Sequence, residues 1–312
     1  MSRFLTRRLV ELVLVFMGVT FAIYAMVYSL PGDPIRALGG DRPLSPAVVA
    51  ELRSRYHLDE PLWQQYLRYL GGLFQGDLGT DFDGRSVTER MATRWPTTIT
   101  LALTAWLIEI VVGVGLGILA GLRRGTWIDR SVLTLTIVAT SVPVFVLAIV
   151  GQLFFGVRWD VLPIAGDSEG WPTAYLLPAA VIAVYSLAAL ARLMRGSLVD
   201  VLQADFVRTL DAKGLTRRRV VGLHVMRNSL IPVITFLGMD LGFLLGGTIV
   251  VEGVFNLPGV GQLLFGAIRS HEGPTVVGVS TALILLFLVT SVVVDLVNSA
   301  LDPRIRREEP RS

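Results

Sequence analysis

Six long apolar stretches, separated by polar connections, dominate the amino-acid sequence. Each is close to the roughly 20 residues that a helix needs to cross a bilayer core about 30 Å thick. A helix is expected there because it satisfies its own backbone hydrogen bonds where water is absent. The stretches cover residues 9–30, 99–122, 132–155, 176–193, 230–251 and 276–297. The pattern therefore predicts an all-α integral membrane protein with six transmembrane helices.

The first stretch has a second interpretation as a cleaved signal peptide, because Arg3, Arg7 and Arg8 precede it. A signal peptide usually has an apolar core of about 7–15 residues, and this run is longer. We therefore expect a helix that is retained in the membrane.

The composition agrees with a membrane protein and limits its chemistry. Hydrophobic residues make up 53% of the chain and charged residues 17%, whereas soluble domains are about a quarter charged. Cysteine is absent, which excludes disulfides and thiolate metal sites. The single lysine, Lys213, lies in Ala-Lys-Gly, so the chain has no Walker A phosphate loop. Any ATP must therefore bind to another chain.

Basic residues gather in alternate connections between the stretches. Arginines are dense before the first stretch, in the connections 123–131 and 194–229, and in the tail 303–312. The short connection 156–175 instead has Arg158 against three acids. Basic residues near the ends of spans mark the cytoplasmic side. Both termini of this multi-pass membrane protein are therefore predicted to be cytoplasmic.

Residues 31–96 are predicted to form a small external α-helical domain. A Pro-Gly-Asp-Pro sequence at its start ends the first helix, because proline cannot continue a helix. Ser45 and Pro46 suit the N-cap and the first position of another helix, and a further helix is predicted at 61–74, before a loop at 76–84. Without disulfides, a segment of this size has a marginal core. We expect it to pack on the spans or on a partner.

Two stretches carry glycines spaced four residues apart, which places them on one helix face where backbones can approach closely. We predict that these faces pack helices together, and the alternative is a moving interface or a passage wall. The two sets are Gly113, Gly117, Gly121 and Gly238, Gly242, Gly246.

Two acids, Glu109 and Asp240, fall deep inside apolar stretches. An ionisable group inside a membrane is costly and is a candidate for function. We interpret them as an interhelix polar contact or as part of a passage wall, with a proton relay as the alternative.

The connection between the fourth and fifth stretches holds the most informative segment. Asp205 is a candidate N-cap, and Gly214 suits the left-handed position that ends a short helix. Thr216 can begin a second short helix. Phe206 and Leu210 share one helix face. Such a helix can dock a cytoplasmic partner or can lie on anionic lipid, and the residues alone leave both open.

Several motifs carry a resemblance to a known family. The loop motif is Arg208-Thr209-Leu210-Asp211-Ala212-Lys213-Gly214-Leu215, followed by Arg227-Asn228-Ser229-Leu230-Ile231-Pro232. The other motifs are Leu30-Pro31-Gly32-Asp33-Pro34, Tyr56-His57-Leu58-Asp59-Glu60-Pro61, Gly76-Asp77-Leu78-Gly79, Leu257-Pro258-Gly259-Val260-Gly261-Gln262-Leu263 and Leu301-Asp302-Pro303-Arg304-Ile305-Arg306. The loop motif resembles the cytoplasmic loop of ABC importer permeases. The other motifs are similar to those of the dipeptide/oligopeptide/nickel group, in particular of the first permease of such pairs, which implies a location in the bacterial inner (plasma) membrane. One departure is Leu210-Asp211, where the family commonly has a small residue and a base.

The resemblance implies a type I ABC importer permease fold and a chain without catalytic, metal or cofactor sites of its own. Its implied partners are a second similar permease, two cytoplasmic ATPase subunits that bind ATP and Mg, and an extracytoplasmic substrate-binding protein or lipoprotein. The implied organisation is residues 1–30 for the N-terminus and first span, 31–96 for the external domain, 97–302 for the permease core with the coupling loop 194–229, and 303–312 for the cytoplasmic tail.

The resemblance also assigns roles to residues. A coupling helix seated in a groove of the ATPase is implied for Asp205, Phe206, Arg208, Thr209, Leu210, Asp211, Ala212, Lys213, Gly214 and Leu215. A turn at Leu257, Pro258, Gly259 and Gly261 is a possible contact for the binding protein, since proline presets φ and glycine permits a reversal.

The function that the resemblance implies is half of the passage of an ATP-driven importer of di- or oligopeptides. The alternative is a proton-coupled secondary transporter that uses Glu109 and Asp240. An intramembrane enzyme is disfavoured, because His57, His224 and His271 are scattered and no G-x-S-x-G motif occurs. The sequence leaves the substrate open among dipeptides, oligopeptides, glutathione, haem and nickel complexes.

Overall fold

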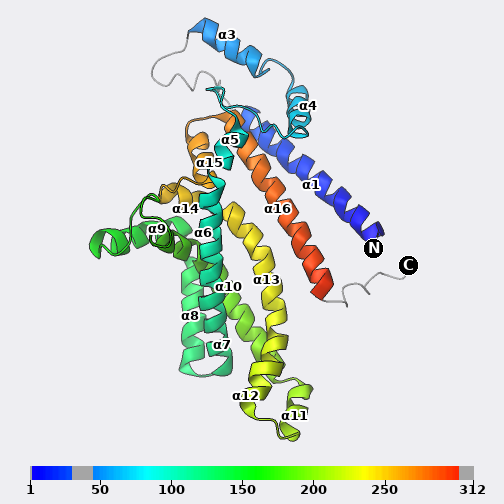
Figure 1. Cartoon of the computed structure of the whole chain (residues 1–312), viewed down its shortest axis with the longest axis vertical. Coiled ribbons are helices and arrows are strands. Elements are labelled where there is room, and N and C mark those ends of the chain that lie inside the picture. The colour runs from blue at the N-terminus through cyan, green and yellow to red at the C-terminus, as the bar shows by residue number, and fades with distance from the viewer. Residues whose placement is uncertain (1, 30–44, 302–312) are drawn as a thin grey trace. The chain divides into compact units, whose positions relative to one another are not determined.

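The structure is a computed structural model that describes residues 2–29 and 45–301 (Figure 1). The Pro-Gly-Asp-Pro motif at 31–34 and the predicted tail 303–312 lie outside the described residues. Within the described ranges the elements are helical, apart from an isolated bridge between Thr80 and Ser86. The chain divides into two compact units, Met1–Thr98 with Asn256–Val289, and Ile99–Phe255 with Thr290–Ser312. Each unit is described by itself.

The first unit contains the first helix, the helices of the predicted external domain and two helices near the C-terminal end of the described residues. They are α1 (Ser2–Ser29), α3 (Pro46–Arg55), α4 (Leu62–Leu73), α5 (Val87–Ala92), α15 (Val260–Arg269) and most of α16 (Gly273–Leu301). The predicted helices after Ser45 and at 61–74 are confirmed by α3 and α4, and the N–H of Val48 donates to Ser45 Oγ at 3.4 Å. Helix α5 was not predicted, although Ser86 and Glu89 have the spacing of a capping box, and Ser86 Oγ accepts from the Glu89 N–H.

The second unit holds most of the remaining helices. In chain order they are α6 (Trp95–Ile108), η1 (Glu109–Val114), α7 (Gly115–Leu122), α8 (Trp127–Ser141), α9 (Val144–Gly151), η2 (Gln152–Arg158), α10 (Thr173–Leu202), α11 (Asp205–Ala212), α12 (Arg217–Arg219), η3 (Val220–Val225), α13 (Met226–Gly247) and α14 (Ile249–Val254). Helix α10 packs along α7, α8 and α13 (Figure 1).

Long apolar helices confirm a membrane-spanning architecture. Within residues 2–29 and 45–301, five helical segments are long and apolar enough to cross a bilayer, and the bent pair of α8 and α9 gives a sixth crossing if the two helices together form one. The five are Val10–Ser29, Val87–Leu122, Thr173–Leu202, Arg217–Val254 and Gly273–Val293.

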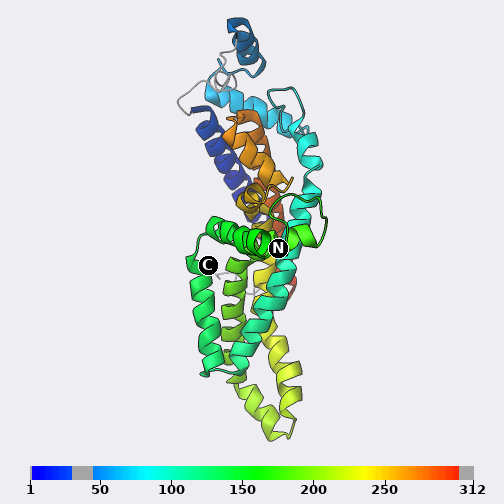
Figure 2. The ribbon, with the colours of Figure 1, turned by 90° about the vertical axis from the view of Figure 1, so that its left-hand side faces the viewer.

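The prediction of one continuous helix at 132–155 is wrong. Helix α8 and the helix Val144–Arg158, which consists of α9 and η2, meet at an angle of 100° (Figure 2). Pro143 has no N–H and disfavours helical geometry in the residue before it, and Val142 is extended, with φ −98° and ψ 124°. The freed carbonyl oxygen of Val142 accepts a hydrogen bond from the Tyr185 hydroxyl. This backbone carbonyl is therefore hydrogen-bonded inside the protein, as it must be where no water is available in a membrane.

The first set of glycines is a packing face, as predicted. A Cβ atom built on Gly117 would lie 2.6 Å from the carbonyl oxygen of Ala191 and 2.6 Å from Met194 Cβ, both in α10. Gly113 and Gly121 also face α10. In the second set, a Cβ on Gly242 would lie 2.8 Å from Thr290 Cγ2 in α16, whereas Gly246 faces open space.

Candidate coupling site

The predicted coupling helix forms the connection between α10 and α13. Helix α11 ends at the C-cap Lys213, and Gly214 follows with φ +76°, the left-handed conformation predicted for it. The N-cap prediction for Asp205 is wrong by one residue, since Ala204 holds that position and Asp205 lies in the first turn. Thr216 is the N-cap of α12, as predicted, although its side chain makes no cap hydrogen bond.

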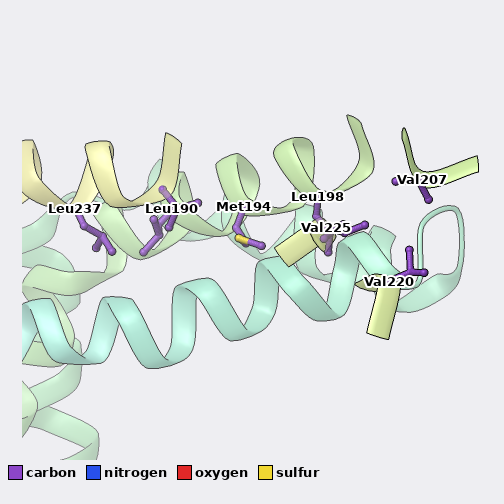
Figure 3. Close-up of a cluster of buried hydrophobic side chains, with 8 residues drawn as sticks. Leu190, Met194, Leu198, Val207, Val220, Val225 and Leu237 are labelled. Atoms are coloured by element: carbon purple, nitrogen blue, oxygen red, sulfur yellow. The ribbon is translucent and has the colours of Figure 1, made fainter. Parts of the chain in front are cut away.

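Buried valines fix α11 to the ends of the longer helices. Val207 is 2% exposed and belongs to a cluster of buried side chains that extends along α10 as far as Leu237 in α13 (Figure 3). Leu210 and Leu215 pack against the same cluster. The other members are Leu190, Met194, Leu198, Val220, Val225 and Val233. This cluster, called here the coupling core, joins α11 to α10, η3 and α13 in one packed body.

The apolar face predicted for α11 is only partly right. Leu210 packs inward, but Phe206 is 39% exposed and Val207 takes the inner position. The pair that faces the coupling core is therefore Val207 and Leu210, at a spacing of three residues. Phe206 projects from the outer side, where a large exposed apolar side chain can serve as a contact for a partner.

The rest of the predicted coupling residues form the outer surface of α11. Asp205, Arg208, Thr209, Asp211, Ala212, Lys213 and Gly214 are exposed. The ion pairs on this surface are long and exposed, 3.8 Å for Arg208 with Asp205 and 3.9 Å for Asp211 with Arg217. Pairs of this kind contribute little to stability, so these charges can rearrange when another surface approaches.

An ion pair with a buried acid lies near the coupling core and was not predicted from the sequence. Arg195 of α10 donates from Nε to Asp129 Oδ1 at 2.8 Å and from a terminal nitrogen to Asp129 Oδ2 at 2.8 Å. Asp129 is 3% exposed and also accepts from the Gly125 N–H at 2.9 Å. This two-bond geometry ties the turn between α7 and α8 to α10. The only sequence signal was an isolated acid in an arginine-rich connection.

The two deep acids come together at the centre of the second unit. Glu109 begins η1, is completely buried and lies beside Asp240 of α13. Ser186 Oγ of α10 donates to Asp240 Oδ1 at 2.6 Å. Among the described residues, neither Glu109 oxygen nor Asp240 Oδ2 has a hydrogen-bond donor. Two carboxylates only accept, so the acids can hydrogen-bond to each other only if one carries a proton. The two acids are therefore neighbours from η1 and α13, and their role as an interhelix contact or as part of a passage wall stays a prediction.

The predicted external turn is packed inside the first unit. Leu257, Gly259 and Gly261 are buried, and Pro258 is half-buried. The left-handed residue of the turn is Asn256, with φ +49°, whereas Gly259 has φ −96° and caps α15. A contact between these residues and a binding protein stays a prediction, and their burial leaves little surface for it.

Comparison with known families decides what kind of protein carries this loop. Residues 113–307 match the family described as binding-protein-dependent transport system inner membrane component. Residues 1–102 match the N-terminal domain description of the same systems. The chain belongs to this family. It is thus the multi-pass inner-membrane permease of a binding-protein-dependent ABC transporter and not its ATPase. This assignment rejects the alternative of a proton-coupled secondary transporter.

Full-length relatives support the same assignment. The permease is 32% identical over 339 residues to the dipeptide transport system permease protein DppB of Escherichia coli K12, which covers 99% of this chain and 100% of that one. It is 35% identical to the di/tripeptide transport system permease protein DppB of Pseudomonas aeruginosa, over 99% and 100% of the two chains. It is 36% identical to the glutathione transport system permease protein GsiC of Salmonella paratyphi A, over 98% and 99%.

Solved structures show the same fold at lower sequence identity. A crystal structure of an amino acid ABC transporter with histidines matches 68% of this permease and 94% of that chain, with a TM-score of 0.54 at 14% identity. An inward-facing structure of the MetNI methionine ABC transporter matches 68% and 96%, with a TM-score of 0.54 at 17% identity. At these identities the likeness concerns the fold alone.

Proposed function

We propose that this permease forms one half of the passage of an ATP-driven importer of short peptides, and that α11 receives the movement of a cytoplasmic ATPase. The observation that carries the proposal is the two-sided construction of α11. Val207 and Leu210 anchor its inner side in the coupling core, while Phe206 and the charged residues face outward. A surface helix anchored in this way transmits force, because it cannot move without the helices that it packs against.

The path of the movement follows the packing of the second unit. Helix α10 has 30 residues, so it is about 45 Å long at 1.5 Å per residue. A movement of α11 reaches η3, which it contacts, and then α10, which packs against η3 in the coupling core. From α10 it passes to α7 through the glycine face and to α8 through the pair of Asp129 and Arg195. Tightly packed helices move together because the interior has few voids to absorb a shift.

The partners in this proposal follow from the family and from the absent phosphate loop. Two ATPase subunits bind ATP with Mg and close on each other, a second similar permease completes the passage, and an extracytoplasmic binding protein or lipoprotein delivers the substrate. The three arginines of α12 lie beside α11 in the chain and favour the cytoplasmic side for this loop. Both termini of the permease are then cytoplasmic.

The substrate class rests on the relatives, which are named for dipeptides, di/tripeptides and glutathione. All three are short peptides. With the assembled transporter and its binding protein, dipeptides are expected to stimulate ATP hydrolysis and uptake. Stimulation by haem or a nickel complex, without any by short peptides, would contradict the peptide assignment.

Photo-crosslinking tests the docking of α11. A benzoylphenylalanine residue placed at Phe206 in the complete transporter should crosslink to the ATPase subunit. The matched control is the same residue at Trp127, a 74% exposed aromatic of α8 outside the loop, which should give no ATPase adduct. Adducts with lipid alone at Phe206 would show that α11 lies on the membrane surface and would overturn the docking proposal.

A further inference from the structure

Helix α4 has three faces of different character. One face, with Tyr66 and Tyr69, packs against α1 and α16. A second face is apolar and exposed, with Trp63 at 57%, Leu67 at 56% and Phe74 at 90%. Phe74 is the C-cap and keeps helical geometry, so these three side chains share one stripe at 100° per residue. The third face, about 100° further round, carries Gln64 and Arg68 and is polar.

The depth of α4 beside α1 is fixed by hydrogen bonds. The Tyr66 hydroxyl lies 2.8 Å from Thr20 Oγ1 and donates to the Met17 carbonyl oxygen at 3.0 Å. Both residues lie inside the candidate span Val10–Ser29. Thr20 is nine residues before Ser29, which is about 14 Å along a helix. Tyr24 also donates to Gln65 Oε1 of α4 at 3.3 Å. Helix α4 therefore packs against the membrane-spanning part of α1.

Contacts with α16, a second candidate span, place α4 at the same depth in the membrane. Val277, one turn inside α16, is buried together with Tyr24 and Tyr66. The first residue of α16, Gly273, faces Val27 near the end of α1, so the ends of these two spans are level. Figures 1 and 2 both show α4 beside the upper part of α1. The exposed apolar stripe consequently lies at the depth of one leaflet and not out in the aqueous phase.

We infer that Trp63, Leu67 and Phe74 contact the lipid of the leaflet at the Ser29 end of α1, so that α4 is an interfacial anchor of the permease. Lipid fits this stripe because an apolar face beside a polar face is typical of helices that lie in a membrane interface. Tryptophan is enriched at that level. The polar face with Gln64 and Arg68 then meets headgroups and water, and Arg68 pairs there with Glu60 at 2.8 Å.

Spin-label accessibility tests this inference in the complete transporter. The chain has no cysteine, so a single introduced cysteine is unique within it, and the cysteine-free permease in the same complex gives the background. Nitroxides at Trp63→Cys, Leu67→Cys and Phe74→Cys in liposomes should collide with oxygen severalfold more often than with a water-soluble nickel chelate. The matched controls Gln64→Cys and Gln75→Cys should show the opposite preference.

The alternative occupants give distinct results. A preference for the nickel chelate at the three apolar positions would mean that water covers the stripe, and low collision with both reagents would mean that a protein subunit covers it. Either result would overturn the inference.

A measurement without spin labels guards against altered folding of the labelled variants. Wild-type transporter should lose more fluorescence than Trp63→Phe when brominated-chain lipids replace ordinary lipids, and equal losses would contradict the lipid contact.

Discussion

Gly214 has the strictest backbone requirement in the coupling loop. Its φ of +76° is in the left-handed region, which costs other residues about 1–2 kcal/mol. Proline, with φ fixed at about −65°, cannot adopt it. A Cβ atom there would touch nothing within 4 Å, so the requirement is conformational and not steric. Gly214→Pro should abolish substrate-stimulated ATP hydrolysis while the chain still inserts into the membrane. Gly214→Asn, which tolerates this conformation, should retain most of it. Normal stimulation in Gly214→Pro would refute the coupling role.

Loss of the ion pair between Asp129 and Arg195 should destabilise the permease. Asp129 is 3% exposed, and in Asp129→Ala the partner charge on Arg195, whose side chain is 25% exposed, would be left unpaired. Removing one member of a fully buried pair costs about 3–5 kcal/mol, and the partial exposure of Arg195 places the expected loss below that range. Asp129→Ala should therefore lower the melting temperature of the purified transporter. Arg208→Ala is the matched control, since its pair with Asp205 is exposed and worth about 0–1 kcal/mol. Equal melting temperatures for the two variants would show that the buried pair contributes little.

Some single-residue features of the loop could be predicted from the sequence and others could not. The left-handed Gly214 and the N-cap Ser45 were predictable because each has a local backbone reason. The inner position of Val207 was not, because Phe206 and Val207 are both apolar neighbours and only the direction of α10 and η3 decides which faces inward. Asp129 and Arg195 are 66 residues apart in sequence, so no local pattern connects them.

Among the elements, the glycine face between α7 and α10 offers a matched pair of substitutions. A methyl group on Gly117 would meet the Ala191 carbonyl oxygen and Met194 Cβ at 2.6 Å. Overpacking of this kind costs about 1–3 kcal/mol, so Gly117→Ala should lower the melting temperature of the purified transporter. Gly115 lies in the same helix with nothing within 4 Å, and Gly115→Ala should leave the melting temperature unchanged or raise it. Equal melting temperatures for the two variants would contradict a close approach at Gly117.

The apolar stretches predicted the spans well, because hydropathy over about 20 residues reports what the bilayer requires. Hydropathy reports composition and not direction, so it could not distinguish one straight crossing at 132–155 from the bent pair α8 and α9. Pro143 was the one residue in this stretch that indicated a break in the helix. Its effect depends on Tyr185 of α10, which satisfies the freed Val142 carbonyl oxygen from a distant part of the chain.

At the scale of the whole molecule, the proposed orientation places the Thr80 loop and the Arg218 helix on opposite sides of the membrane. The arginines of α12 favour the cytoplasm, and α5 and α6 form one continuous candidate span after the Thr80 loop. Thr80→Cys should react with an impermeant maleimide added to intact cells after outer-membrane permeabilisation. Arg218→Cys should react only after the inner membrane is opened. Labelling of both from the same side would overturn the orientation.

The complete transporter, and not this chain alone, should be the smallest unit that transports. Glu109 is fully buried and Asp240 is only 7% exposed, whereas a proton carrier has to be open to water on each side of the membrane in turn. Purified permease in proteoliposomes with a pH gradient should show no uptake, whereas the assembled transporter should show uptake that depends on ATP. Glu109→Gln should keep that uptake, because its amide can donate to Asp240 Oδ2, which lacks a donor among the described residues. Uptake driven by the pH gradient in the permease alone would instead make the two acids a proton pathway.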